Sequence, residues 1–325
     1  MTSVAGFTKG LHELGNGHYA YLQPDGSWGW SNSGLITDAG QSILVDTLFD
    51  CRLTAEMLAE MRRATPAAQQ IDILINSHSN GDHTFGNRLV EGARIVASKT
   101  AAEEMITAGP EPIANLMRNT KNMGRAGRFL DRVFSPFDFE GIGGIMPLPT
   151  ETFERELTLT VGSKSVQLIE VGPAHTGGDI LVLVPEDRIV YVADVLFVGG
   201  HPVIWAGPTA NWIKALNLIK SLDVEVIVAG HGPLASKQDV QNLIDYFEFL
   251  LRECKIRYEA GVSAKDAARE FAQGPYGKWA EPERLIINAM AIYGELSGGE
   301  LKFASPVERF DVIAEFDEVI RGTAV

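Results

Sequence analysis

The feature that most constrains the fold of this chain is a coarse internal duplication of β-like and helical patterns. In the first half, paired β-like runs are followed by a helical pattern and by a wholly apolar run, at 18–23, 33–37, 42–46, 54–65 and 71–75. The second half repeats this order at 152–172, 179–197, 211–222 and 224–230. Short apolar runs without alternation are typical of strands that are covered on both faces. Two such halves facing each other predict an α/β protein with a four-layer αββα sandwich.

The domain organisation follows from where this pattern stops. At 325 residues the chain exceeds the size at which a single core usually stops growing. We predict a catalytic domain over 1–236 and a helical C-terminal extension over 237–325 that packs on it. Pro and Gly residues and basic helical pieces interrupt the pattern at about 109–150, which predicts a helical insertion there.

Charge and composition narrow the partners. The formal net charge is −14, which disfavours a nucleic acid or an anionic membrane, since both are bound through clustered lysines and arginines. No apolar run reaches the roughly 20 residues of a membrane span, and the N-terminus lacks the apolar stretch of a secretory signal. We therefore expect a cytoplasmic protein with a small-molecule substrate. The two cysteines, Cys51 and Cys254, are expected to be buried free thiols.

Four of the seven histidines lie just beyond apolar strands, and two aspartates accompany them. The histidines are His78 and His83 after 71–75, His175 after 166–173, and His231 after 224–230. The aspartates are Asp82, in the loop beside His83, and Asp194, which is expected to end its strand. Imidazole nitrogens and carboxylate oxygens are the ligands of hydrolytic zinc sites, which leave one position open for water. The pattern therefore predicts a metal centre.

These residues resemble those of the metallo-β-lactamase superfamily of metal-dependent hydrolases, over roughly residues 10–235. The superfamily motif His-x-His-x-Asp-His is matched by the sequence HSNGDH at 78–83, with Asn80 in place of the second histidine. Later landmarks are also present in order, in the stretches AHTGGD, VADVLF and AGHGP. An early aspartate, Asp46, resembles the third-strand aspartate that lies near the metals. The resemblance implies the αββα fold inferred above.

The resemblance also implies a division of the ligands. Positions 78, 80 and 175 would hold one metal, Asp82, His83 and His231 would hold the second, and Asp194 would bridge them. An amide oxygen is a weaker zinc ligand than an imidazole nitrogen. We therefore predict one tightly bound Zn²⁺ at Asp82, His83, Asp194 and His231, and a weak or altered site at His78, Asn80 and His175. A dinuclear centre in which Asn80 binds adequately stays open, as do iron and manganese in place of zinc.

The implied activity is hydrolysis of an ester, thioester, lactone or amide-type bond by a zinc-activated water. The catalytic candidates are Asp82, which would orient the water and accept its proton with Asp194 as the alternative, and His175 or Asn80, which would hydrogen-bond the oxyanion. Three other functions stay open: hydrolytic dehalogenation of an activated aromatic, an iron-dependent dioxygenase activity, and a non-catalytic binding role. Chloride release, stoichiometric iron, or inertness with bound metal would indicate each in turn.

The substrate pocket is harder to place from sequence. Trp205 and His201 follow the Asp194 strand, and Trp30 lies in an early loop expected to cover the site, so these three are predicted to line the pocket. The basic run at 118–128 is expected to be a solvated helix face, with attraction of an anionic substrate as the alternative. Apolar stripes in the helical tail predict packing on the body, and they also fit a cap over the pocket or a homodimer interface.

Overall fold

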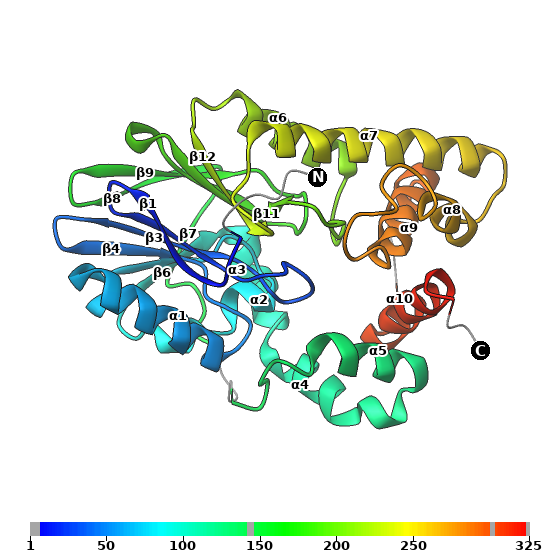
Figure 1. The fold of residues 1–325 in the computed structure, drawn as a ribbon, viewed down its shortest axis with the longest axis horizontal. Coiled ribbons are helices and arrows are strands. Elements are labelled where there is room, and N and C mark those ends of the chain that lie inside the picture. The colour runs from blue at the N-terminus through cyan, green and yellow to red at the C-terminus, as the bar shows by residue number, and fades with distance from the viewer. Residues whose placement is uncertain (1–6, 142–145, 300–302, 323–325) are drawn as a thin grey trace.

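The computed structural model describes residues 7–141, 146–299 and 303–322. Two β-sheets face each other, and helices cover their outer faces, α1 on one side and α6 and α7 on the other (Figure 1). A further group of helices, α4, α5 and α8 to α10, lies at one end of the sandwich. The predicted α/β fold with an αββα sandwich and a helical C-terminal extension is confirmed.

The first sheet has the strand order β1 to β7. Its strands are β1 (Gly10–Gly15), β2 (His18–Leu22), β3 (Ser33–Asp38), β4 (Gln41–Val45), β5 (Ile73–Ile75), β6 (Arg94–Ser98) and β7 (Glu151–Phe153). The first four strands pair antiparallel, as the turn-rich sequence predicts, and β4 to β7 pair parallel. The change to parallel pairing requires crossovers, and α1 supplies the first of them.

The second sheet has the strand order β12-β11-β10-β9-β8. Its strands are β8 (Glu156–Val161), β9 (Lys164–Glu170), β10 (Ile180–Val184), β11 (Ile189–Phe197) and β12 (Val226–His231). The strands β8 to β11 are antiparallel neighbours, and β12 pairs parallel to β11 after the crossover through α6. Each half of the chain therefore ends its sheet with a parallel strand.

A buried apolar layer holds the two sheets together. It contains Ile36, Val45 and Ile75 from the first sheet and Leu168 and Val182 from the second. Because successive side chains of a strand point to opposite faces, the neighbours of these residues fall in the layer between sheet and helices. For burial on both faces a strand must be apolar throughout, which is why the predicted runs lack alternation.

The helices follow the predicted pattern, with adjusted ends. They are α1 (Cys51–Ala64), α2 (Gly81–Thr84), α3 (Lys99–Thr107), α4 (Pro110–Asn119), α5 (Gly124–Phe134), α6 (Thr209–Ser221), α7 (Lys237–Glu259), α8 (Ala264–Phe271), α9 (Arg284–Ser297) and α10 (Pro306–Ile320). A 3₁₀ turn, Asn87–Leu89, follows α2. None of the described helices is both long and apolar enough to cross a membrane.

The predicted insertion supplies α4 and α5, and α5 packs on α10 from the end of the chain. Arginines of α5 pair with carboxylates of α10 across this contact: Arg125 with Asp311, Arg128 with Glu318, and Arg132 with Asp317. Arg118 in α4 pairs with Glu111 and Glu140. The three arginines of the basic run therefore form ion pairs within the chain while staying partly exposed.

The division of the chain at residue 236 stays a prediction. One hydrophobic cluster contains both body residues such as Trp212 and residues of the extension such as Phe247 and Ile286. The extension therefore shares its core with the sandwich. The parts of the predicted ranges at 1–6, 142–145, 300–302 and 323–325 lie outside the described residues.

Candidate metal centre

Six side chains from both halves of the chain meet at one end of the αββα sandwich. They are His78, Asp82, His83, His175, Asp194 and His231. Two ligand groups form, one of His78, His175 and Asp194, and one of Asp82, His83 and His231, each with its ligand atoms within 4.8 Å of one another. The sequence therefore identified a set of residues that the fold brings together.

The carboxylate of Asp194 lies at the middle of this arrangement. Its Oδ1 lies 3.0 Å from Nε2 of His83, and its Oδ2 lies 3.3 Å from Nε2 of His175 and 3.4 Å from Nε2 of His231. The Nε2 atom of His78 is 3.9 Å from the same Oδ2. Oδ1 thus faces a histidine of the second group and Oδ2 faces histidines of both groups, so Asp194 lies between the two sets of ligands.

The backbone around Asp194 differs from the expectation that the strand ends there. The strand β11 continues to Phe197, and its register with β12 shifts on both sides of Ala193, whose φ is +42°. Such a bulge turns the next side chain out of the regular alternation. Gly230 on β12 completes the fit, because a Cβ there would lie 2.0 Å from Oδ1 of Asp194.

Every histidine of the centre is held through its Nδ1 atom. The partners are Ser77 Oγ for His78 at 2.9 Å, Asp46 Oδ2 for His83 at 2.9 Å, the Val203 carbonyl for His175 at 2.7 Å, and the Gly26 carbonyl for His231 at 3.0 Å. Histidines that bind a metal commonly use the second ring nitrogen in this way, which fixes the ring orientation. All four Nε2 atoms are consequently directed toward the shared centre.

Asp46 is the most heavily used of these supporting groups. Its carboxylate accepts hydrogen bonds from the backbone N–H and the hydroxyl of Ser77, at 2.7 and 2.6 Å, as well as contacting His83. The residue follows β4 with a φ of +63°, a region that aspartate tolerates better than most residues. Asp46 therefore connects the loop after β4 to His83, which is fully buried in the centre.

The unpaired atoms of the centre fit a cation. Nε2 of His78, Nε2 of His83 and Oδ1 of Asp194 are buried and form no hydrogen bond of good geometry among the described residues, although the last two atoms lie 3.0 Å apart. Buried polar atoms are normally satisfied, and these three converge on one point from both sheets. Nitrogen and oxygen donors of this kind suit zinc, and other divalent transition metals as well.

The electrostatics of the bare site agree with this assignment. Burial alone would lower the pKa of His83 and His231, but the adjacent carboxylates of Asp194 and Asp82 outweigh it. The pKa of His83 is raised well above its ordinary range, and that of His231 is raised to about 9. Burial lowers the pKa of His78 well below its ordinary range, helped by the charge of His83. Without a metal, protons on His83 and His231 therefore balance the carboxylates, and metal binding releases them.

Asn80 lies at the edge of the first ligand group. Its Oδ1 is 2.7 Å from Nε2 of His175. Each ring nitrogen of His175 lies 2.7 Å from an oxygen acceptor, Nδ1 from the Val203 carbonyl and Nε2 from Oδ1 of Asn80, and a neutral imidazole can donate to only one of them. Burial lowers the pKa of His175, which favours this neutral form. Its place in the first ligand group favours a ligand role for His175, and a role as oxyanion donor stays a prediction.

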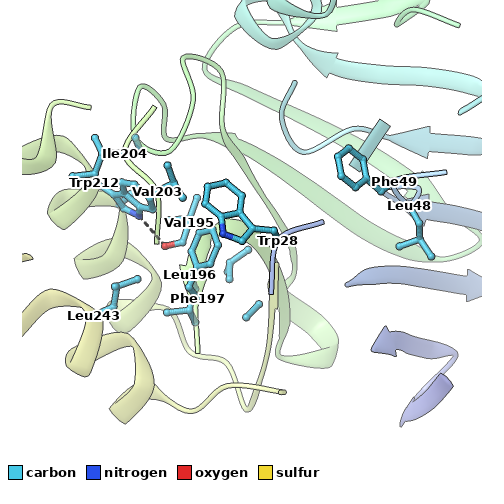
Figure 2. Packing of buried hydrophobic residues seen from close by; sticks show 14 of the residues in the cluster. Trp28, Leu48, Phe49, Val195, Leu196, Phe197, Val203, Ile204, Trp212 and Leu243 are labelled. Atoms are coloured by element: carbon cyan, nitrogen blue, oxygen red, sulfur yellow. Dashed lines mark hydrogen bonds between the residues drawn. The ribbon is translucent and has the colours of Figure 1, made fainter. Parts of the chain in front are cut away.

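A cavity of about 420 Å³ opens onto the metal residues. Its wall is rich in aromatic side chains: Trp28, Phe49, Phe85, Phe134, Phe197, Trp205 and Phe310. Trp28, from the loop between β2 and β3, and Phe197, from β11, lie beside each other on one side of it, and Phe49, from the loop after β4, lies apart from them (Figure 2). The volume and lining are those of a site for a small, largely apolar molecule.

Of the three predicted pocket residues, one lines this cavity. Trp205 does, and its backbone N–H donates to the carbonyl of His175. His201 does not, because it is fully buried, where Nδ1 contacts the hydroxyl of Tyr246. Trp30 does not line it either, and its ring packs on Phe137. The early loop contributes Trp28 instead, two residues before the predicted position.

The sequence reasoning missed the residues that the end of the chain contributes. Arg284, Pro306, Arg309 and Phe310 line the cavity, as do Ile113 and Leu116 of the insertion. The apolar stripes themselves, such as Leu285 and Ile286 of α9, lie in the shared core, and other residues of the tail line the cavity. No sequence pattern marked Arg284 and Arg309 as cavity residues, because a single arginine in a helix is usually on a solvated face.

Comparisons with known proteins agree with the fold. The model of the metallo-beta-lactamase superfamily matches residues 26–231, which is more than half of the chain. No curated protein matches. Among solved structures, the inverting sec-alkylsulfatase Pisa1 from Pseudomonas sp. aligns with a TM-score of 0.63 and 18% identity, over 88% of this chain and 50% of that chain.

Smaller relatives align over their whole length. A metallo-beta-lactamase from Pontibacter korlensis covers 74% of this chain and 99% of its own, with a TM-score of 0.51 and 17% identity. The beta-lactamase TMB-1 gives 74% and 98%, with a TM-score of 0.51 and 18% identity. The present chain spans half the length of the alkylsulfatase. At these identities the likeness shows the shared fold.

The chain belongs to the metallo-beta-lactamase superfamily, whose model covers every predicted metal ligand from His78 to His231. Its fold is that of the hydrolases named above.

Proposed function

We propose that this protein is a metal-dependent hydrolase that uses a zinc-activated water to cleave an ester, thioester, lactone or amide-type bond in a small molecule. The observation that carries the proposal is the convergence of four Nε2 atoms on the carboxylates of Asp82 and Asp194, next to an aromatic cavity. When bound, zinc would lower the pKa of a water toward about 7 and supply a nucleophile near neutral pH.

The chain's own groups would complete the reaction. Asp82 is the more accessible of the two carboxylates, with its side chain 15% exposed against 4% for Asp194, and it lines the cavity. It is therefore placed to orient a water and to take up its proton. Asn80 also lines the cavity, and because its Oδ1 faces His175, its Nδ2 is the end that can donate to an oxyanion.

The test uses protein that has been stripped of metal with a chelator and reloaded with zinc. A panel of aryl esters, thioesters, lactones and amides should show turnover that depends on reloading. Secondary alkyl sulfates belong in the panel because a sec-alkylsulfatase shares the fold. A reloaded, folded protein that is inert across this panel would contradict the proposal.

A second function is favoured by the aromatic cavity, which suits an activated halogenated aromatic. Hydrolytic displacement there would release chloride without acyl cleavage, so chloride must be measured in the same reactions. Stoichiometric iron with oxygen uptake after aerobic purification would instead indicate the oxygen-using chemistry.

We also propose that the two ligand groups differ in affinity. Tight binding falls to Asp82, His83, Asp194 and His231, because Asn80 offers the other group only an amide oxygen. Titration of the stripped protein with zinc against a competing chelator should show one tight equivalent. The variant Asn80→His should show two, because the imidazole restores the third nitrogen. Two equally tight equivalents in the unmodified protein would contradict this assignment.

A further inference from the structure

Arg309 is a cation in the cavity wall with no counter-charge among the residues that the structure describes. It lies on α10 and lines the cavity. Its guanidinium forms neither a hydrogen bond nor an ion pair with any residue in the described ranges, and its Nε is buried without a partner. The neighbouring arginines Arg125, Arg128 and Arg132 all pair with carboxylates. Arg309 therefore stands apart from the ion pairs that join α5 to α10.

The surroundings of Arg309 are apolar. Its guanidinium lies 5.0 Å from the ring centroid of Trp205 and 5.4 Å from that of Phe303. Burial in this setting lowers the pKa of the group, which nevertheless stays charged at any ordinary pH. A partly desolvated charge without a partner is unfavourable unless an opposite charge binds beside it.

The other charged groups of the cavity already have partners. Glu104 accepts hydrogen bonds from the hydroxyl of Ser79 at 2.6 Å and from the backbone N–H of Gly177 at 3.0 Å. Arg284 donates to the carbonyl of His201 at 2.9 Å and stacks over Trp28 at 4.4 Å. Arg284 is thus used to hold the wall, although its Nε is also buried without a partner, whereas Arg309 has no hydrogen-bond or ion-pair partner at any donor among the described residues.

We propose that Arg309 binds an anionic group of the substrate, a carboxylate or a similar oxyanion carried on an apolar body, while the scissile bond lies at the metal residues. The inference rests on the proposed hydrolase function and adds a substrate class to it. A planar guanidinium matches such a group with two parallel hydrogen bonds. Trp205 connects the two parts of the site, since its ring lies beside the Arg309 guanidinium and its backbone N–H donates to the backbone carbonyl of His175.

The kinetic test compares two esters of matched size, monophenyl glutarate and phenyl pentanoate, which differ by a terminal carboxylate. In the zinc-loaded full chain, Arg309→Gln should raise KM for monophenyl glutarate by about 10- to 100-fold, the effect of a charge-assisted hydrogen bond. Its kcat should stay within about twofold, as should both constants for phenyl pentanoate. Arg309→Lys should be intermediate, because it keeps the charge and loses the fork.

Arg128→Gln is the matched control, since Arg128 is exposed and pairs with Glu318 outside the cavity. It should leave both esters unaffected. Equal KM changes for the charged and the neutral ester in Arg309→Gln would overturn the anion site, because they would indicate a loss of packing alone.

A binding measurement separates this inference from the hydrolase proposal. Calorimetric titration of zinc-loaded protein with 4-phenylbutyrate and with 4-phenylbutyramide should show at least about tenfold tighter binding of the carboxylate, and Arg309→Gln should remove the preference. If neither ester is hydrolysed but this preference depends on Arg309, the anion site stands and aryl-ester hydrolysis fails. If Arg309→Gln still prefers the carboxylate, the metal holds it and the anion site is wrong.

Discussion

The floor of the cavity, where the six metal residues lie, and the wall around it are built in different ways. At the floor, buried histidines are each fixed through Nδ1, and the supporting groups belong to the two sheets and their loops. The wall combines aromatic residues of the sandwich with helices of the insertion and the end of the chain, where α5 and α10 are joined by partly exposed ion pairs. Substitutions in the wall can therefore change which substrate binds without changing the metal chemistry at the floor.

The largest effect should come from a ligand of the floor. Asp82→Ala removes both a ligand and the proposed proton acceptor, so tight zinc binding and turnover should both be lost. The loss should exceed the roughly 100- to 1000-fold that a single oxyanion donor supplies. Elemental analysis and steady-state kinetics on the same preparation measure the two effects. Full activity in this variant would contradict the proposed role of Asp82 as ligand and proton acceptor.

A supporting residue should have a smaller effect of the same kind. Asp46→Asn weakens the group that holds His83, and such partners usually contribute about 10- to 100-fold in metal affinity. Competition with a zinc chelator measures the change. Asp72→Asn is the control, because Asp72 accepts from the backbone of Ser42 in the same sheet. If both variants bind zinc like the unmodified protein, the floor does not depend on its hydrogen bonds.

The same contrast explains how much the sequence could predict. The ligands of the floor follow strands that are legible as apolar runs, and parallel strand ends meet at one edge of a sheet, so their placement followed from pattern and motif. Asp46 was also found this way. The bulge that carries Asp194 was not, because one extra residue in a strand leaves no periodic signal.

The wall was less predictable, because it depends on which distant helices meet. Arg309 lies more than a hundred residues from any metal ligand except His231 in the chain, and nothing near it in sequence indicates the contact with Trp205. His201 was placed on the cavity because it follows the Asp194 strand closely. In the structure the chain turns there and buries His201 against Tyr246 of α7 instead.

That burial gives a pH-dependent prediction for the helices behind the wall. Burial, with the charge of Arg284 adding to it, lowers the pKa of His201 to about 3. The unfolded chain takes up the proton near pH 6.5, whereas the folded protein does not, so stability is full above that pH and is lost as the pH falls toward 3. Between pH 6.5 and pH 5 the loss from this residue should be about 2 kcal/mol.

Urea unfolding of metal-free protein across this range measures that slope. His201→Phe should flatten it by the same amount, whatever its absolute stability. His12→Phe is the control, because His12 contacts only the Thr8 carbonyl at an exposed site. An unchanged slope in His201→Phe would show that another group causes the acid sensitivity.

The smallest expected effect concerns the ion pairs of the wall. Arg125 donates from Nε and Nη2 to the two carboxylate oxygens of Asp311, at 2.8 and 2.7 Å, with both side chains more than a third exposed. Pairs exposed to this degree contribute about 0.2 to 1 kcal/mol, and salt screens them. Arg125→Gln should lower the free energy of unfolding by that amount at low salt and by less at 0.5 M salt, leaving zinc affinity unchanged.

Arg188→Gln, which loses surface pairs to Asp223 and Glu225 outside the cavity, controls for charge alone. If Arg125→Gln also raises KM and Arg188→Gln does not, the pairs position the wall for substrate. A matching loss of zinc affinity would instead mean that floor and wall are coupled, and the contrast drawn between them would fail.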